Sequence, residues 1–189
     1  MIDTDGKNLT RLTNQIGLDT APSWSPDGQR IAFMSRRGGD DDIFVMDADG
    51  GNQTRITRNL DLSGNPSWSP DGQRIAFDAF EDKNFEIYVV DPDGKNLDRL
   101  TNNLVHDQAP AWSPDGRKIA FNKWEVVPFP HIEIHLMTSD GKYLKRLTNL
   151  PNHDDYHPDW TDSSGRAVSP TGNQITIWGR VKKFSSLFR

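Results

Sequence analysis

The chain has 189 residues, a hydrophobic content of 34% and a formal net charge of −5 at pH 7. The acidic balance argues against nucleic acid as a partner, no apolar run is long enough to span a membrane, and the absence of Cys excludes disulfides and thiol chemistry. We expect one compact domain, because a chain of this length can bury a substantial core.

A repeat with a period in the mid-forties dominates the sequence. Four tryptophans each follow a proline by two residues, at steps of 44, 44 and 48 residues: Trp24, Trp68, Trp112 and Trp160. A second block, Arg followed by an aliphatic residue and Thr, keeps the same period at residues 11–13, 55–57, 99–101 and 146–148. Such a period, with four strand-like segments in each unit, is typical of a β-propeller blade.

The unit at residues 66–101 shows the predicted elements in chain order. We predict strands at residues 66–69, 74–78, 86–90 and 97–101, with a loop at residues 79–85. Tight turns are predicted at residues 70–72 and 91–96, where Pro presets φ and Gly accepts a positive φ. Because the strands alternate in direction, both tight turns lie on one face of the disc, here called the turn face. The longer loops, including those between blades, lie on the opposite face, here called the loop face.

The predicted fold is an all-β propeller of four four-stranded blades, a single domain over residues 1–181. Residues 9–13 are predicted to pair with the fourth unit, around Trp160 and residues 174–178, so that N- and C-terminal strands close the last blade. The alternative is that the sequence is part of a larger propeller. The fourth unit carries an insertion before its second strand, and residues 182–189 are predicted to be a basic C-terminal tail. Residues 1–6 are mostly polar, and we do not expect them to form a signal peptide.

The repeat resembles that of a known family. Trp-Ser-Pro-Asp-Gly-x-x-Ile-Ala-Phe, followed by Ile-Tyr/Phe-Val, Asp-x-Asp-Gly and Arg-Leu-Thr, looks like the WD-repeat-like β-propeller repeat of the TolB family. The resemblance covers residues 1 to about 160 and implies a propeller that binds partner proteins in the periplasm or outside the cell. Similar repeats form the non-catalytic propellers of prolyl-oligopeptidase-type and tricorn-type peptidases, and the propeller of oligogalacturonate lyase. The resemblance therefore implies a fold rather than one activity.

Two motifs contain residue types that can bind metals. The Asp-x-Asp-Gly segments lack the closing bidentate carboxylate of a calcium loop, and hairpin chemistry explains them. His131, Glu133 and His135 share one face of a predicted strand, which is a candidate zinc constellation. In the repeat alignment, however, His135 falls where Phe44 and Tyr88 stand, which favours ordinary sheet positions. We predict no metal site and no cofactor.

The predicted binding site is the mouth of the central channel on the loop face, because variable loops on a rigid scaffold usually carry binding. Asp19, Asp107 and Asp155 share one repeat position, three residues before the Pro of each Pro-x-Trp. The loop at residues 122–130 adds a hydrophobic flank. The predicted partner-binding residues are Asp19, His106, Asp107, Asp155, Tyr156, His157, Trp124 and Phe129. The alternative is a structural role, in which the Asp side chains accept backbone N–H groups.

These features predict a monomeric, non-enzymatic scaffold that binds a protein or peptide. The excess of Asp in the loops favours partners with basic or hydrogen-bonding groups. One rival is a metal-assisted polysaccharide-degrading enzyme of the oligogalacturonate-lyase type, using His106, His153 and His157. The other rival is the gating propeller of a peptidase. Trp24, Trp68 and Trp112 are predicted to be buried between neighbouring blades.

Overall fold

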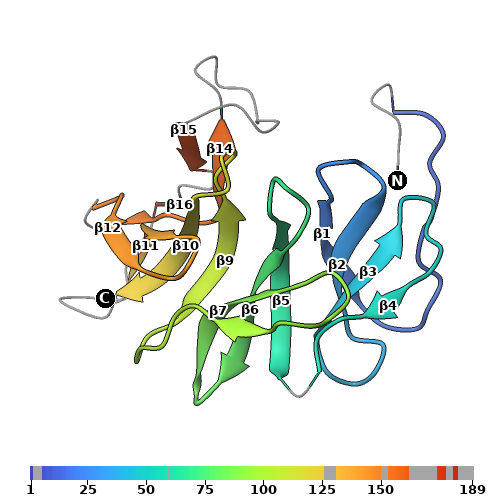
Figure 1. Cartoon of the computed structure of the whole chain (residues 1–189), viewed down its shortest axis with the longest axis horizontal. Helices are drawn as coiled ribbons and strands as arrows, with labels where there is room; N and C mark the ends of the chain where they lie inside the picture. Colours follow the sequence, from blue (N-terminus) through green and yellow to red (C-terminus); the bar gives the residue numbers. More distant parts are fainter. Residues whose placement is uncertain are drawn as a thin grey trace, which may run out of the picture.

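Every element in the described part of the chain is a β-strand, as predicted (Figure 1). The computed structural model describes residues 1, 6–58, 60–125, 131–149, 153–161, 174–177 and 181–182. Three four-stranded antiparallel sheets follow one another, each with its strands in sequence order. Blade 1 contains β1 (Asp19–Trp24), β2 (Arg30–Ser35), β3 (Asp42–Asp47) and β4 (Thr54–Arg55). Blade 2 contains β5 (Asp61–Trp68), β6 (Ile75–Glu81), β7 (Asn84–Val90) and β8 (Asp98–Arg99). Blade 3 contains β9 (Asp107–Trp112), β10 (Lys118–Glu125), β11 (His131–Thr138) and β12 (Tyr143–Arg146).

The fourth unit follows the same register. β14 (Pro158–Thr161) pairs with β15 (Gln174–Ile177) so that Trp160 lies opposite Ile175. Trp24, Trp68 and Trp112 lie opposite Ile31, Ile75 and Ile119 in the same way. Residues 174–177 are therefore the second strand of this unit, as predicted, and the insertion at residues 162–173 falls outside the described residues. A further pair joins β13 (His153–Asp154) to β16 (Val181–Lys182).

The loop predicted at residues 79–85 is instead a strand hairpin. β6 and β7 pair as far as Glu81 opposite Asn84, which leaves only Asp82 and Lys83 in the turn. Both turn residues have positive φ, 53° and 80°. A two-residue turn with two positive φ values matches the twist of the flanking strands, so the hairpin extends to its tip.

The repeated Arg-x-Thr block holds the outer strand of each blade to the third strand. The Thr hydroxyl accepts the N–H of a third-strand isoleucine at 2.8–2.9 Å, in the pairs Thr57–Ile43, Thr101–Ile87 and Thr148–Ile134. The Arg pairs with a buried third-strand carboxylate, in the pairs Arg55–Asp42, Arg99–Glu86 and Arg146–Glu133. The two-residue strands β4 and β8 are thus held by side chains as well as by backbone bonds.

The core is divided among the junctions between blades, and each buried Trp packs against the blade before it. Trp68 belongs to a cluster with Ile43 and Val45 of blade 1, and Trp112 to one with Ile87 and Val89 of blade 2. Trp68 and Trp112 are 6% and 7% exposed, which confirms two of the three predicted burials. Trp24 is 47% exposed, so its predicted burial is wrong. No blade among the described residues precedes blade 1 and covers this ring.

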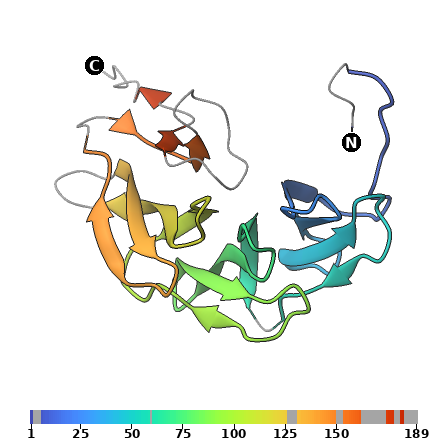
Figure 2. The same cartoon turned by 45° about the horizontal axis from the view of Figure 1, so that its top comes forward.

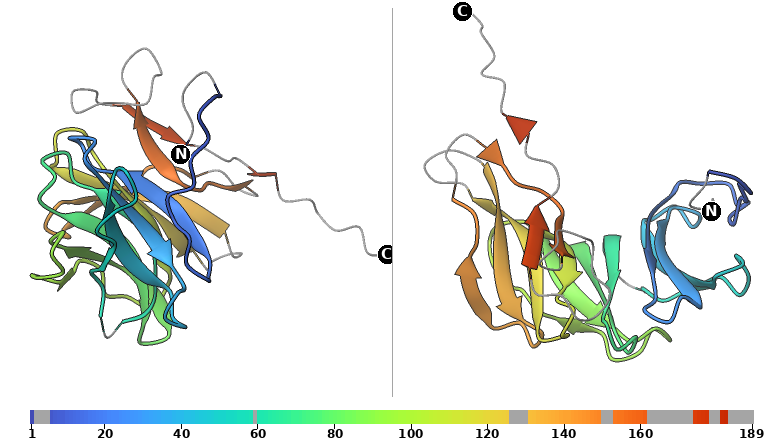
Figure 3. Two further views of the ribbon diagram at one scale, coloured as in Figure 1. Left: turned by 90° about the vertical axis from the view of Figure 1, so that its right-hand side faces the viewer. Right: turned by 90° about the horizontal axis from the view of Figure 1, so that it is seen from above.

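The blades form an open arc, and the predicted ring closure is not confirmed. Figure 2 shows blade 1 and the fourth unit at opposite ends of the arc, and the view from above in Figure 3 agrees. Residues 9–13 form no strand, and Leu9 is exposed. Leu12 instead packs against the blade 1 cluster, beside the hairpin residue Gly50. At the next two junctions, Ile56 lies against Gly94 and Leu100 lies against Gly141 in the same way. Leu12 therefore occupies the place of a preceding blade's outer segment, and none of the described residues forms another strand of such a blade beside it.

Candidate functional site

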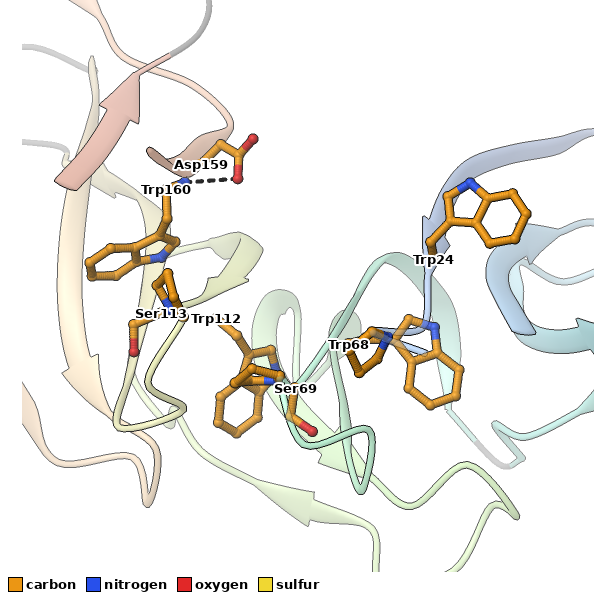
Figure 4. A pocket seen from close by; sticks show the side chains of 10 residues that line it. Trp24, Trp68, Ser69, Trp112, Ser113, Asp159 and Trp160 are labelled. Atoms are coloured by element: carbon orange, nitrogen blue, oxygen red, sulfur yellow. Dashed lines mark hydrogen bonds between the residues drawn. The ribbon is translucent and has the colours of Figure 1, made fainter. Parts of the chain in front are cut away.

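A pocket on the turn face is lined by the tryptophans and by the prolines of the Ser-Pro-Asp-Gly turns. Figure 4 shows Trp160, Trp112, Trp68 and Trp24 following one another along the arc, each from an innermost strand. The pocket has a volume of about 210 Å³. Arg30 lies 4.7 Å from the ring centroid of Trp68, and Arg74 lies 4.9 Å from that of Trp112. The rings at the centre of the pocket are therefore already engaged by the protein's own packing, and only Trp24 offers a large exposed surface.

The loop face carries a row of four aromatic rings, here called the aromatic ladder. Phe80 and Phe85 belong to the β6–β7 hairpin of blade 2, and their ring centroids lie 5.2 Å apart. Phe85 contacts His106 at 5.7 Å, and His106 contacts Trp124 of blade 3 at 5.2 Å in an edge-on arrangement. The backbone N–H of Phe85 donates to Nδ1 of His106, and the N–H of Trp124 donates to the His106 carbonyl. These bonds fix the His106 ring between two blades, while Trp124 remains 41% exposed.

Exposed aliphatic side chains extend this surface along the loops between blades. They stand at two repeat positions just before or at the start of the innermost strands, Ile16 and Leu104 at one and Leu18 and Leu62 at the other. A run of exposed apolar residues on one face marks an interaction surface more often than isolated exposed residues do. His106 and Trp124 were among the residues predicted from the sequence, whereas Phe80, Phe85 and these aliphatic residues were not. The signal was available, since two phenylalanines flank an otherwise charged hairpin tip.

A left-handed residue directly precedes the Pro of each innermost strand. Ala21, Asn65, Ala109 and His157 all have φ between 48° and 51°. A side chain of the preceding blade holds this bend, because Asp78 accepts the N–H of Ala109 at 2.8 Å and Asn122 accepts that of His157 at 3.1 Å. Burial raises the pKa of the Asp78 carboxyl, although the Ala109 N–H and the Asn65 amide oppose this rise. These groups set the path of the strands that line the channel mouth.

The predicted acidic residues differ in exposure. Asp19 is partly exposed and pairs with Arg37 at 3.3 Å. Burial acts to raise its pKa, but hydrogen bonds from Ser35, Thr13 and Arg37 outweigh burial and lower the pKa. Asp107 and Asp155, by contrast, are fully buried. Asp107 accepts hydrogen bonds from the side chains of Lys123 and Asn103, so it holds a loop rather than facing a channel opening.

The remaining predicted residues lie close to the fourth unit. His157 is exposed, Tyr156 is half-buried, and their ring centroids lie 6.3 Å apart. Burial raises the pKa of the Tyr156 hydroxyl, and the neighbouring Asp154 carboxylate adds to the rise. Phe129, the rest of the segment at residues 126–130 and the side chain of His153 lie outside the described residues. The structure thus places His106 and Trp124 in one contact group, and Tyr156 with His157 in another.

The motifs with metal-ligating residue types are engaged in the protein's own contacts. Glu133 pairs with Arg146 at 2.5 Å and accepts the hydroxyl of Thr148. His135 is buried against the rings of Phe121 and Tyr143, and burial lowers its pKa to about 4. In the Asp-x-Asp-Gly segment of blade 1, Asp47 accepts the Asn52 amide and Asp49 accepts a backbone N–H, as hairpin chemistry predicts. In the described part of the chain, no three His, Cys, Asp or Glu side chains are grouped as metal ligands. No helix among these residues is long and apolar enough to cross a membrane.

The arrangement of successive antiparallel four-stranded sheets along an arc, each packed against the next, defines the class of β-propeller proteins. Residues 1–63 and 45–174 match the TolB beta propeller domain family. The chain belongs to this family.

Several known proteins share stretches of the sequence or the fold. A Tol-Pal system protein TolB from Syntrophus aciditrophicus is 48% identical over 42 residues, which are 22% of this chain and 9% of that protein. The putative TolB from Agrobacterium tumefaciens is 30% identical over 72% of this chain and 51% of its own, with a TM-score of 0.66. TolB from Acinetobacter baumannii is 25% identical over 93% of this chain and 44% of its own, with a TM-score of 0.71.

The matched part therefore spans about half or less of these TolB chains. The β-propeller domain of the Trilobed protease from Pyrococcus furiosus shares the fold alone, at 16% identity over 89% of this chain and 57% of that one, with a TM-score of 0.58.

Proposed function

We propose that this protein is a non-enzymatic scaffold whose loop face binds a protein or peptide partner. The aromatic ladder carries this proposal, because it places half-exposed rings beside exposed leucines on one rigid face. Large aromatic side chains held in place by the fold supply contact area at low entropic cost, which is how interface anchors work. The similarity to Tol-Pal system proteins supports a partner that is itself a protein.

The proposed surface is built from the residues predicted from the sequence, some as contact residues and others as buried residues. The contact residues are Asp19, His106, Trp124, Tyr156, His157 and Phe129. Asp107 and Asp155 are buried, and Asp107 accepts hydrogen bonds from Lys123 and Asn103, so these two carboxylates are not proposed as contact residues. The acidic loops favour a partner that brings basic or hydrogen-bonding groups together with apolar side chains. A monomeric state and a periplasmic or extracellular location belong to the same proposal, and nucleic acid is not a proposed partner.

The gating propeller of a peptidase remains the second candidate, because the propeller domain of the Trilobed protease shares the fold. A gating propeller controls access along its channel, so its function would depend on the channel-lining residues and not on the aromatic ladder. This difference separates the two candidates.

The test is a peptide selection against the folded chain. Peptides from a random displayed library are selected on the wild type, and their affinities are measured for Trp124→Ala and Leu104→Ser. We expect each substitution to weaken binding by about tenfold or more, as for an interface anchor. Trp24→Ala is the matched control, because it removes an indole of similar exposure from the turn face. Selected peptides that bind both loop-face variants normally, or that depend on Trp24, would contradict the proposal. Metal analysis of the purified protein and titration with zinc, calcium and manganese test the metal-assisted enzyme directly.

A further inference from the structure

A cleft of about 390 Å³ lies between blades 2 and 3. Its apolar walls are Leu100 of blade 2 and Phe121, Met137 and Tyr143 of blade 3. Asn103, Asp107 and Lys123 form its polar end. Phe121 and Met137 are almost fully buried, so they form fixed walls. The cleft has the size of a small ligand site and the usual character of one, with apolar walls and a few fixed polar groups.

The polar end is preorganised and close to electrically neutral. The Lys123 ammonium lies 3.0 Å from a carboxylate oxygen of Asp107 and 3.1 Å from the side-chain oxygen of Asn103. Asp107 is fully buried, and its second oxygen accepts the Asn103 amide at 2.6 Å. An ammonium has three N–H donors, and these two contacts use two of them. Because Asp107 already neutralises Lys123, the third donor suits a neutral acceptor such as a carbonyl better than a second carboxylate.

The junction between blades 1 and 2 shows what the fold places in the equivalent position. There Leu60 is buried, with 9% exposure, in a cluster that contains Ile56, Phe77, Ala79 and Val90. The repeat equivalents of these four cluster members, Leu100, Phe121, Lys123 and Met137, all line the cleft. The equivalent of Leu60 is Leu104, which is 99% exposed. Leu60 therefore fills the junction between blades 1 and 2, whereas Leu104, at the junction between blades 2 and 3, is exposed to solvent.

Three substitutions between the repeats account for this difference. In blade 2, Ala79 lies opposite Ser63. The equivalent residues of blade 3 are Lys123 and Asp107, so an ion pair stands where the first junction has two small side chains. Tyr88 becomes His135, a smaller ring at the same register position. The junction between blades 2 and 3 thus loses part of its apolar filling and gains hydrogen-bonding groups.

We propose that this cleft binds a leucine-like side chain of a partner polypeptide together with the neutral carbonyl group of the same residue. The apolar walls take the side chain, as the first junction takes Leu60, and Lys123 donates to the carbonyl. The proposal stands apart from the loop-face surface, since it concerns a cleft between blades and can be tested with a single capped amino acid.

The probe is N-acetyl-leucinamide, and the readout is the ¹³C-methyl resonance of Met137, one of four methionines in the chain. We expect a saturable shift with a Kd below about 10 mM, which is a normal affinity for a fragment of this size. N-acetyl-glycinamide lacks the side chain and should give no saturable shift. N-acetyl-leucine carries a carboxylate and should bind more weakly than the amide.

Two double variants test the two parts of the cleft. Asp107→Ser with Lys123→Ala reproduces the Ser63–Ala79 pair that blade 2 already tolerates, so the fold should survive. It should weaken binding of the amide by about tenfold, the value of one hydrogen bond from a charged donor. Asp107→Ser with Lys123→Leu fills the cleft and should abolish binding. Far-UV circular dichroism confirms folding of both variants.

Three results would overturn the proposal. The first is the absence of a saturable Met137 shift in the wild type, and the second is unchanged binding in the filled variant. The third is a shift of the Met137 methyl resonance in Leu104→Ser without any probe, because Leu104 itself would then occupy the cleft. None of these results bears on peptides that depend on Trp124, so a failure here is distinguishable from a failure of the proposed function.

Discussion

The repeat supplies an internal control for the contribution of its tryptophans to stability. Trp68 is 6% exposed between two blades, whereas Trp24 is 47% exposed at the equivalent position of blade 1. Replacing a buried Trp by Ala removes the transfer free energy of the ring and leaves a cavity, at a typical cost of about 3–5 kcal/mol. Arg30 stacks on Trp68 and loses this contact as well. Only about half of the Trp24 side chain is buried, so we expect Trp24→Ala to lower the free energy of unfolding by about 1–2 kcal/mol.

Urea denaturation followed by far-UV circular dichroism measures both costs without relying on the fluorescence of the mutated residues. With a slope of about 2 kcal/mol per molar urea, Trp68→Ala should lower the midpoint by about 2 M and Trp24→Ala by less than about 1 M. Equal shifts for the two variants would refute the argument, because they would show that Trp24 is buried to the same extent as Trp68. A shift below about 0.5 M for Trp68→Ala would show that its ring is not part of the core.

Two further predictions concern stability. The buried His135 has its pKa lowered to about 4, so the folded state keeps the ring neutral while the unfolded chain takes up a proton below pH 6.5. The wild type should therefore lose about 2 kcal/mol more than His135→Phe between pH 7 and pH 5 in urea titrations, and parallel pH profiles would contradict the burial of this ring. Gly94 and Gly28 both have positive φ, but a Cβ at Gly94 would lie 2.9 Å from the Ile56 carbonyl oxygen, whereas nothing lies within 4 Å of one at Gly28. Gly28→Ala should cost about 1 kcal/mol and Gly94→Ala about 1–2 kcal/mol more in thermal unfolding, and equal costs would show that this contact between blades is not tight.

The sequence alone determined the architecture, because the interactions that form each blade are made by residues of the same unit or of its neighbour. The turn residues, the alternating strands and the Arg-x-Thr block recur at a fixed period, and each acts within one unit or between neighbours. The register of the fourth unit could be predicted even across its insertion, since Trp160 and Ile175 keep the pairing of the other repeats. The hairpin bonds of the Asp-x-Asp-Gly segments could be predicted for the same reason, because Asp47 and Asp49 accept hydrogen bonds from within their own hairpin.

Only the tertiary structure decided which equivalent residues are exposed. Trp24 and Trp68 stand in nearly identical sequences, yet one ring is half exposed because burial depends on the neighbouring blade and not on the residue's own unit. Leu60 and Leu104 differ in the same way, since Lys123 and Asp107 form an ion pair at the junction beside Leu104 where the junction at Leu60 has Ala79 and Ser63. Asp107 shares its repeat position with Asp19 but is fully buried, and it contacts Lys123 and Asn103 where Asp19 pairs with Arg37. Repeat position specifies the backbone of each blade, whereas contacts between blades determine the surface that a partner can reach.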